Sequence, residues 1–331
     1  MRALTHSRFP LRTELFPFAT FPIQDGLLPG ESGPGYVLRM ASKNHVGYYE
    51  LLRHIDLYPY PYLTIDATTK IAPLFGVMSK NIMRVTAENY KIYGQCHTKL
   101  NGLIFKKPYL IRQRSPQVCH LCLKENSYAQ LAWDLTLYTA CIAHKISLID
   151  HCPSCNKPLS WARNDLSLCK CGKPLFSDSV KSIPASESQL LVSKVISHKF
   201  AGDIPCSISN TFLFQLFDSL SLDIFMRLVW SFGLHDQSKF SRRTQGKQIP
   251  CTNSTIELIN HSISRINYAL NHNFSSPLEI DINQTSLNDV LNDANYVEFK
   301  KIHHLLDKVS ELDKLPRILD SNSSKQLSLF E

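Results

Sequence analysis

The sequence predicts a mainly α-helical protein in three parts: a helical N-terminal region, a cysteine-rich middle and a helical C-terminal region. Three observations predict this fold class. Apolar residues recur at helical spacing on both sides of the middle, the middle groups its cysteines in close pairs, and one N-terminal stretch has the spacing of two helices that cross at a short turn. We expect the parts to cover residues 1–110, 111–176 and 177–331.

The composition supports a folded chain with an ordinary core. Apolar residues make up 44% of the 331 residues, which excludes wholesale disorder. Lysine and arginine exceed aspartate and glutamate by 36 − 28 = 8, a mild excess that permits contact with nucleic acid without demanding it.

The chain also lacks the sequence features of membrane insertion or secretion. Its most apolar segment, 212–232, is interrupted by Gln215, Asp218, Asp223 and Arg227, so it is predicted to be one buried amphipathic helix. The first ten residues have no continuous apolar stretch, and we therefore expect a cytoplasmic protein whose cysteines stay reduced.

The N-terminal region is predicted to begin with an arm and continue with short helices. Residues 1–32 are rich in proline and phenylalanine, which indicates an extended arm that wraps a neighbour. Two sets of residues then recur at helical spacing, namely Tyr48, Leu51, Leu52 and Ile55, and Ile71, Leu74, Phe75 and Met78.

The second of these sets opens a candidate helix-turn-helix. Its small, glycine and apolar positions are Ala72, Gly76, Met78, Ile82 and Val85. Ser79 is the expected N-cap of the second helix, which would expose Lys80, Asn81 and Arg84 as candidate contacts with nucleic acid or a partner. Pro73 departs from the pattern unless the first helix starts late. The alternatives are a helix pair that packs only against protein, and a plain exposed polar face.

The cysteines of the middle region have the spacing of zinc ligands. Four close pairs follow one another: Cys119 and Cys122, Cys141 and His144, Cys152 and Cys155, and Cys169 and Cys171. Each pair forms a turn that presents two ligands to a tetrahedral ion. The segments CPSCNKPL (152–159) and CKCGKPL (169–175) also resemble two copies of one knuckle. We therefore expect two structural Zn²⁺ ions, each with four protein ligands and no open position for chemistry.

Two pairings of these ligands remain open from the spacing. In the tandem arrangement the first two pairs hold one ion and the last two pairs hold the other, so each loop closes locally. A cross-braced arrangement would join the first pair to the third and the second to the fourth. His120 and His151 fall outside the spacing and are expected either to take no part in the sites or to donate hydrogen bonds to the ligand side chains. Cys96, Cys206 and Cys251 are expected to be small buried side chains.

The C-terminal region is predicted to be helical. Its apolar stripes are Leu213, Leu216, Phe217, Leu220, Ile224 and Leu228; Ile256, Ile259, Ile263, Ile266 and Leu270; Leu287, Val290, Leu291 and Ala294; and Ile302, Leu305, Leu306 and Val309. Residues 239–253 form an expected exposed loop whose basic residues Arg242, Arg243 and Lys247 are further candidate contacts.

The sequence shows no motif of the common nucleotide-binding or hydrolytic sites. There is no GxxxxGK[ST], no GxGxxG before a helix, no GxSxG and no HExxH. The acidic residues near the cysteines, Glu125, Asp134, Asp150 and Asp165, are not spaced as a metal-binding cluster. We therefore expect a protein that is not an enzyme.

Two segments resemble a known family. CHLCLKENSYAQLAWDLTLYTACIAHKISLIDHCPSCNKPL (119–159) resembles the TniQ family of transposon targeting proteins, whose members show CPxCL-E-x-x-Y, then C-x-x-H, then L-x-x-x-C-P-x-C. LLPGESGPGYVLRMASKNHV (27–46) resembles the family's N-terminal segment, in which an acidic-Ser step precedes a Tyr-bearing helix with R-x-A. His120 replaces the usual proline, which shapes the turn but holds no metal.

The resemblance implies a fold and a function. It implies an N-terminal helix-turn-helix region, two tandem zinc fingers on the eight ligands named above, and an all-helical C-terminal part. Family members mark an insertion site and recruit an AAA+ ATPase regulator of transposition. Some act as adaptors, often as head-to-tail homodimers, on a nuclease-deficient CRISPR Cascade complex with its crRNA and target DNA. The alternative is a TnsD-like selector that binds a specific DNA sequence directly, without guide RNA.

Overall fold

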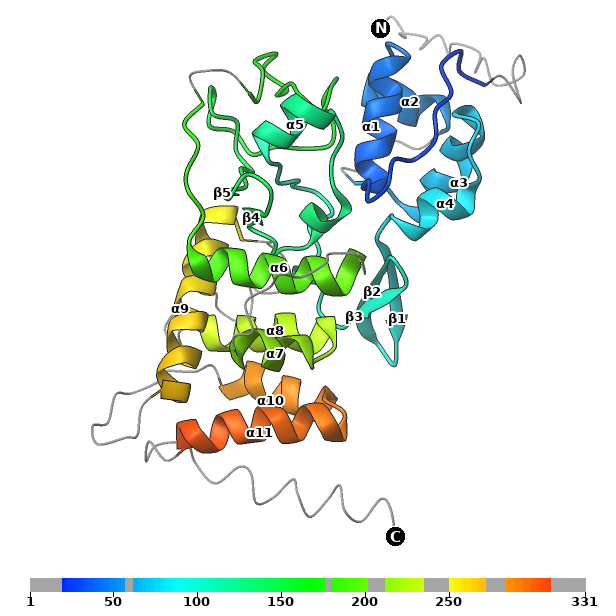
Figure 1. Ribbon diagram of the computed structural model, residues 1–331. Helices are drawn as coiled ribbons and strands as arrows, with labels where there is room; N and C mark the ends of the chain where they lie inside the picture. Colours follow the sequence, from blue (N-terminus) through cyan, green and yellow to red (C-terminus); the bar gives the residue numbers. More distant parts are fainter. Residues whose placement is uncertain are drawn as a thin grey trace, which may run out of the picture.

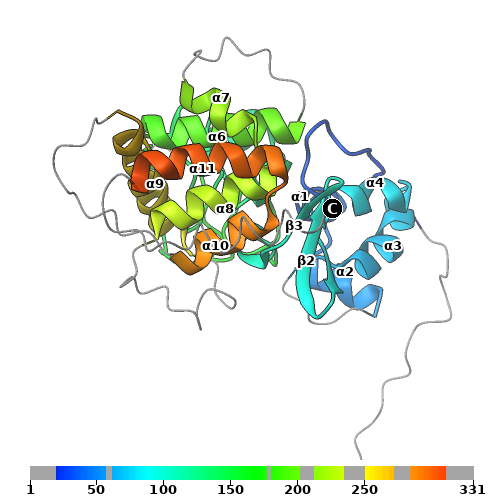
Figure 2. The ribbon, with the colours of Figure 1, turned by 90° about the horizontal axis from the view of Figure 1, so that it is seen from below.

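The computed structural model describes residues 20–56, 62–176, 180–201, 212–234, 250–271 and 284–310. Two groups of elements lie side by side in both views, the N-terminal helices in one and the cysteine-rich region with the later helices in the other (Figure 1; Figure 2). Within these ranges the prediction of a mainly helical protein is confirmed. None of the helices in the described ranges is long and apolar enough to cross a membrane.

The N-terminal group contains four helices, α1 (Gly33–Lys43), α2 (Tyr48–His54), α3 (Ile65–Leu74) and α4 (Ser79–Arg84). The described part of the arm, from residue 20 to residue 32, forms no helix or strand of its own. The Phe21 ring stacks on Phe75, and its amide donates to the Leu74 carbonyl oxygen. This part of the arm therefore packs on the chain's own α3.

The arm is fastened to α1 by a buried ion pair. The Arg39 guanidinium binds both carboxylate oxygens of Glu31, at 2.7 and 2.8 Å, and also contacts Asp25 at 3.0 Å. The side chains of Arg39 and Glu31 are 7% and 0% exposed. A bidentate pair of this kind fixes direction as well as distance, so it sets the angle at which the chain enters α1.

Helices α3 and α4 form the predicted helix pair, with two differences at the turn. Helix α3 ends in a Schellman motif: Gly76, at φ +70°, donates to the Pro73 carbonyl, and Val77 donates to the Ala72 carbonyl. The N-cap of α4 is Met78, so the prediction for Ser79 is wrong, and Ser79 is the first helical residue.

Pro73 lies inside α3, in its last turn, although this helix already starts at Ile65. A proline there leaves the carbonyl of Thr69, four residues earlier, without its helical donor. The Ser79 hydroxyl contacts that carbonyl at 3.5 Å. Because Pro73 lies close to the end of α3, it removes only one helical hydrogen bond. The contact from the Ser79 hydroxyl partly replaces that bond.

A three-stranded antiparallel sheet, which was not predicted from the sequence, follows α4. Its strands are β1 (Glu88–Ile92), β2 (Gln95–Leu100) and β3 (Leu103–Phe105), in the order β1-β2-β3. Two-residue turns connect them, Tyr93-Gly94 and Asn101-Gly102, and all four residues have positive φ. This is the type I′ geometry, and Asn-Gly is its strongest sequence signal.

The cysteine-rich region has little regular structure. It contains the short helices η1 (Pro108–Leu110), α5 (His120–Asn126) and η2 (Leu131–Asp134), and the two-stranded hairpin β4 (Ala140–Cys141) and β5 (Ile146–Ser147). Much of its backbone pairs through isolated bridges, such as Val118 with Ile149. A region built in this way needs another source of stability than helices and sheets.

Six helices form the last group: α6 (Glu187–Ala201), α7 (Phe212–Asp218), α8 (Leu222–Gly233), α9 (Thr252–Asn271), α10 (Gln284–Asp293) and α11 (Tyr296–Ser310). Every residue of α8 is buried, and α6, α9 and α10 pack against it. The predicted apolar stripes that lie in the described residues face this core, except that Ile256 is only partly buried and is not part of it. The Val309 side chain lies outside the described residues.

The single helix predicted over 212–232 is two helices. Helix α7 ends at Asp218, and α8 begins after its N-cap, Ser221. The Glu298 carboxylate accepts the Ser221 amide at 2.6 Å. Leu220 between them is buried, so the apolar spacing continues across a break that hydrogen bonds create.

Polar contacts join the cysteine-rich region to the last group. Arg112, 1% exposed, donates to the Asp150 carboxylate at 2.6 Å and to the Pro250 carbonyl at 3.1 Å. Asp150 also accepts the amide of Thr252, the first residue of α9, at 2.7 Å. Next to the sheet, the Asp223 carboxylate of α8 accepts the Lys106 amide at 2.8 Å. These contacts cross the boundaries predicted at residues 110/111 and 176/177, and that division stays a prediction.

Candidate metal centres

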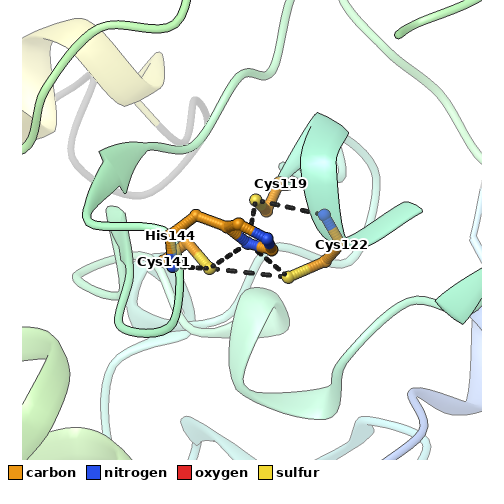
Figure 3. A group of neighbouring side chains, drawn as sticks. All are labelled: Cys119, Cys122, Cys141 and His144. Carbon is orange, nitrogen blue, oxygen red and sulfur yellow. Dashed lines mark hydrogen bonds between the residues drawn. The ribbon is translucent and has the colours of Figure 1, made fainter. Parts of the chain in front are cut away.

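The first candidate metal centre gathers four side chains from α5 and from the β4–β5 hairpin. Cys119 is the N-cap of α5 and Cys122 lies in its first turn, whereas Cys141 ends β4 and His144 lies in the turn before β5. The four side chains point toward one another (Figure 3). Within each close pair a backbone N–H donates to the sulfur of the first residue at 3.5 Å. The Cys122 amide donates to Cys119 Sγ, and the His144 amide donates to Cys141 Sγ.

The distances in this cluster match a tetrahedral zinc site. The Sγ atoms of Cys122 and Cys141 lie 3.5 Å apart, and His144 Nδ1 lies 3.3 to 3.5 Å from the three sulfurs. Ligands about 2.3 Å from a tetrahedral ion lie about 3.8 Å from one another. The sulfurs are too far apart for a disulfide, whose bond is about 2.05 Å long. The donor set therefore fits Zn²⁺.

Glu125 orients the histidine of this cluster. Its carboxylate Oε1 lies 3.0 Å from His144 Nε2, on the side of the ring away from the sulfurs. With Nε2 donating to the carboxylate, Nδ1 keeps its lone pair for a metal. This role of Glu125 was not predicted from the sequence, although its spacing of three residues from Cys122 on a helix was an available signal.

The second candidate centre contains four cysteines and is built from a repeated knuckle. Cys152 Sγ lies 3.8 Å from Cys171 Sγ, and Cys155 Sγ lies 3.8 Å from Cys169 Sγ. The Cys152 amide donates to the carbonyl of Lys157, and the Cys169 amide donates to the carbonyl of Lys173.

The repeat extends to the leucine that ends each knuckle. The Leu159 amide donates to the Asp150 carbonyl and the Leu175 amide to the Ser167 carbonyl, in both cases two residues before the first cysteine. Both leucines are buried. The likeness of the two segments that the sequence indicated is therefore a likeness of hydrogen bonding and packing.

The two clusters are positioned to bind two zinc ions in the tandem arrangement. Cys119, Cys122, Cys141 and His144 have their ligand atoms within 4.8 Å of one another, and so have Cys152, Cys155, Cys169 and Cys171. The tandem pairing is thus confirmed and the cross-braced pairing is excluded. Bound there, zinc would supply stability to a loop-rich segment, because four protein donors complete a tetrahedral site.

The other cysteines and histidines that the sequence singled out are not members of these clusters. His120 Nε2 contacts Ser182 Oγ at 3.0 Å, and His151 Nδ1 contacts Asp150 Oδ1 at 2.7 Å. Cys96 is exposed and Cys251 is partly buried, so the prediction of a buried side chain is wrong for Cys96. Cys206 lies outside the described residues.

The predicted contact residues form two sets. Lys80, Asn81 and Arg84 are exposed on α4, and Arg84 Nε donates to the Asn101 side chain in the β2–β3 turn at 3.0 Å. Their role stays a prediction. Arg242, Arg243 and Lys247 lie outside the described residues.

Residues 22–148 match the family model TniQ. The chain contains a TniQ domain. The matched range runs from the arm through α1 to α4, the sheet and the first metal centre, and ends just after β5. The second centre and the last group of helices lie beyond it. No curated protein matches the chain. The TniQ domain indicates a transposition targeting protein.

A buried carboxyl group joins α1 to the cysteine-rich part of the TniQ domain, and spacing gave no sign of it. Asp134, 6% exposed, accepts the hydroxyl of Ser32, the N-cap of α1, at 2.7 Å. Burial raises the pKa of Asp134 to about 7, and the Ser32 hydrogen bond opposes this rise. The carboxyl is therefore neutral in the folded chain over part of the pH range in which it is charged in the unfolded chain.

This pKa predicts a loss of stability as pH rises. A carboxyl with a raised folded-state pKa binds more protons when folded, so it costs nothing below about pH 4 and destabilises increasingly up to about pH 7. Between pH 6 and 8 we expect Asp134 to lower the free energy of unfolding by about 1 kcal/mol. Asp134→Asn should remove this part of the pH dependence in urea titrations. If the free energy of unfolding changes by the same amount between pH 6 and 8 in Asp134→Asn as in the parent, Asp134 does not have a raised pKa.

Proposed function

We propose that the chain is a non-catalytic adaptor that links a nuclease-deficient, RNA-guided Cascade complex at target DNA to the AAA+ regulator of transposition. The match to the TniQ family over residues 22–148 is the observation that carries this proposal. The adaptor acts in the cytoplasm, at the nucleoid when the complex is on its target. The guide RNA reads the sequence, so this chain needs only to grip protein and some DNA backbone.

The metal centres support a scaffolding role. Each offers four protein donors, so a bound zinc ion has no position left for a substrate or an activated water. The modest net charge of +8 also suits a chain that meets DNA together with protein partners.

A tagged pull-down tests the proposal. The chain is expressed with the genes that neighbour its own, purified through the tag, and analysed by mass spectrometry and RNA extraction. We expect Cas subunits, a discrete crRNA-sized RNA and the AAA+ ATPase. The Cys119→Ser variant, whose first metal centre should fail to form, is purified in parallel for comparison. Recovery of the ATPase without Cas proteins or RNA would contradict the adaptor.

The adaptor is proposed to act as a head-to-tail homodimer. Light scattering after gel filtration should then give twice the monomer mass of 37.7 kDa. A mass equal to one chain at micromolar concentration would contradict this part of the proposal.

A second candidate function is direct, sequence-specific DNA binding without guide RNA. The pair α3–α4 is followed immediately by an antiparallel sheet, the element order of a helix-turn-helix with a β-wing. Residues 62–107 contain seven lysine and arginine residues against two acidic ones. Lys80, Lys91 and Lys99 are exposed among them, so this part of the surface is complementary to phosphate.

Lys80→Ala separates the two functions. Under direct reading, the wild-type chain alone protects one sequence in a footprint, and the variant loses that protection. Under the adaptor proposal the chain alone binds DNA weakly and without sequence preference. The variant then weakens this binding about equally at every sequence and lowers its salt dependence by about one counterion. Arg84 is a poorer probe because its side chain also holds the β2–β3 turn through Asn101.

A further inference from the structure

The tip of the β1–β2 hairpin carries an aromatic side chain that makes no contribution to the core. Tyr93 is fully exposed, at 102%, and its neighbour Ile92 is 40% exposed. The opposite end of the sheet is held against α4, where the Asn101 amide donates to the Arg84 carbonyl oxygen at 2.8 Å. The tip therefore points away from helices α1 to α4 (Figure 1). It presents a large apolar ring to whatever the chain meets.

The backbone at this tip does not favour a tyrosine either. Tyr93 has φ +47°, and it is the only phenylalanine, tyrosine or tryptophan with a positive φ among the described residues. The other two-residue turn of the same sheet has Asn101 at the equivalent position, with φ +52°. Asparagine is a preferred residue there, because it tolerates the left-handed region. Since neither packing nor backbone preference explains Tyr93, its ring is available for a contact outside the chain.

The charge around the tip indicates what that contact is. Residues 89–107 contain four lysines and no acidic residue. Two of these lysines pair with carboxylates of α10, and the other two, Lys91 and Lys99, are exposed. Lys91 lies two positions before Tyr93. An exposed cation next to an exposed aromatic ring suits a nucleic acid, because the cation meets a phosphate while the ring meets a sugar or a base.

We propose that the tip of the β1–β2 hairpin enters the minor groove of duplex DNA, where the Tyr93 ring contacts sugars and base edges and Lys91 neutralises a flanking phosphate. The minor groove is only about 6 Å wide, so a narrow element is needed to enter it. The two-residue turn ends in Tyr93 and Gly94, and Gly94 places no side chain beside the ring. Large apolar side chains are a common means of contact in this groove.

This inference rests on the DNA contact that both proposed functions share. It adds a contact made outside α4, by a residue without charge. Duplex DNA is the form into which a transposon inserts, so it is the form that a transposition targeting protein meets.

Binding of the zinc-loaded full chain to a fluorescein-labelled, A·T-rich duplex of about 30 base pairs tests the proposal by fluorescence anisotropy. Tyr93→Asn should weaken binding by at least about fivefold, because an aromatic contact with DNA is lost. The dependence of binding on salt should stay the same, because no charge changes. In urea the variant should be at least as stable as the parent, because asparagine suits this turn. Weaker binding without lost stability identifies a contact with DNA.

Two variants and one competitor serve as controls. Tyr93→Phe keeps the ring and should bind as the parent does. Ile104→Thr removes an exposed apolar side chain from β3, at a distance from the tip, and should also bind as the parent does. Netropsin, which fills the minor groove of A·T-rich DNA, should weaken binding of the parent and leave that of Tyr93→Asn unchanged.

Three results would overturn the proposal: no binding of the parent at about 100 μM and low salt, parent-like binding of Tyr93→Asn, or an equal effect of netropsin on both proteins. If Tyr93→Asn binds DNA as the parent does but recovers less ATPase in the pull-down, the tip contacts protein and the proposal is wrong. Recovery of Cas subunits and RNA does not depend on this ring, so the adaptor and the hairpin contact fail separately.

Discussion

Replacing Cys152 with serine should leave the chain with one bound zinc ion in place of two and unfold the second knuckle pair. Serine is a poor zinc ligand, and a structural zinc site contributes on the order of 10 kcal/mol to folding. Residues 150–176 contain no helix and no named strand, and their two knuckles share one cluster. Inductively coupled plasma mass spectrometry counts the zinc, and near-ultraviolet circular dichroism reports Trp161, which is buried in this segment.

Cys96→Ser is the matched control for this variant. Cys96 is an exposed cysteine on β2, outside both clusters, so its replacement should keep two zinc ions and the parent's stability. Two zinc ions retained by Cys152→Ser, or an equal loss in Cys96→Ser, would refute the assignment of the second centre.

Replacing Arg112 with alanine should destabilise the protein by about 3 to 5 kcal/mol. The change leaves the Asp150 carboxylate, 8% exposed, without its buried cation, and removes the hydrogen bond to Pro250 just before α9. Urea titration of the zinc-loaded protein measures the free energy of unfolding. Because Asp150 still accepts the Thr252 amide, it is not left without a donor.

Two further variants show whether the charge pair causes the effect. Arg114, two residues away, is exposed, and Arg114→Ala should change stability by less than about 1 kcal/mol. In the double variant Arg112→Ala with Asp150→Asn, part of the lost stability should return, because no unpaired charge remains buried. A double variant whose loss equals the sum of the two single losses would contradict a coupled pair.

The metal centres could be predicted from the sequence because zinc imposes its geometry locally. A tetrahedral ion needs two ligands from one tight turn, so each pair must be close in sequence, as Cys152 and Cys155 are. The N–H···S contacts at Cys119 and Cys141 show the same local constraint. The helical stripes were predictable for a similar reason, since one helix face is a local repeat.

The sheet and the helix break were missed for different reasons. The Asn101-Gly102 turn signal was present, but the strands carry few β-branched residues, and only Leu100 and Phe105 on them bury large apolar side chains. The break before α8 leaves the apolar spacing intact, because Leu220 is buried between two helices. Periodicity cannot locate such a break.

The buried polar contacts depend on residues far apart in the sequence. Ser32 and Asp134 are separated by 102 positions, and Arg112 and Asp150 by 38. Nothing local distinguishes these side chains from solvated ones until packing brings the partners together. The pair Glu31 and Arg39 is nearer in sequence, and both residues fall in the segment that resembles the TniQ opening.

The positions of transposon insertions test most directly whether this chain selects targets. Insertion junctions are sequenced from cells that carry the transposon, its transposase, the AAA+ regulator and the guide-bound complex, with and without this chain. We predict that insertions gather beside the guide-matched site only when the chain is present, while the guide-bound complex occupies that site in both cases. The same distribution of insertions with and without the chain would contradict its role as a targeting protein.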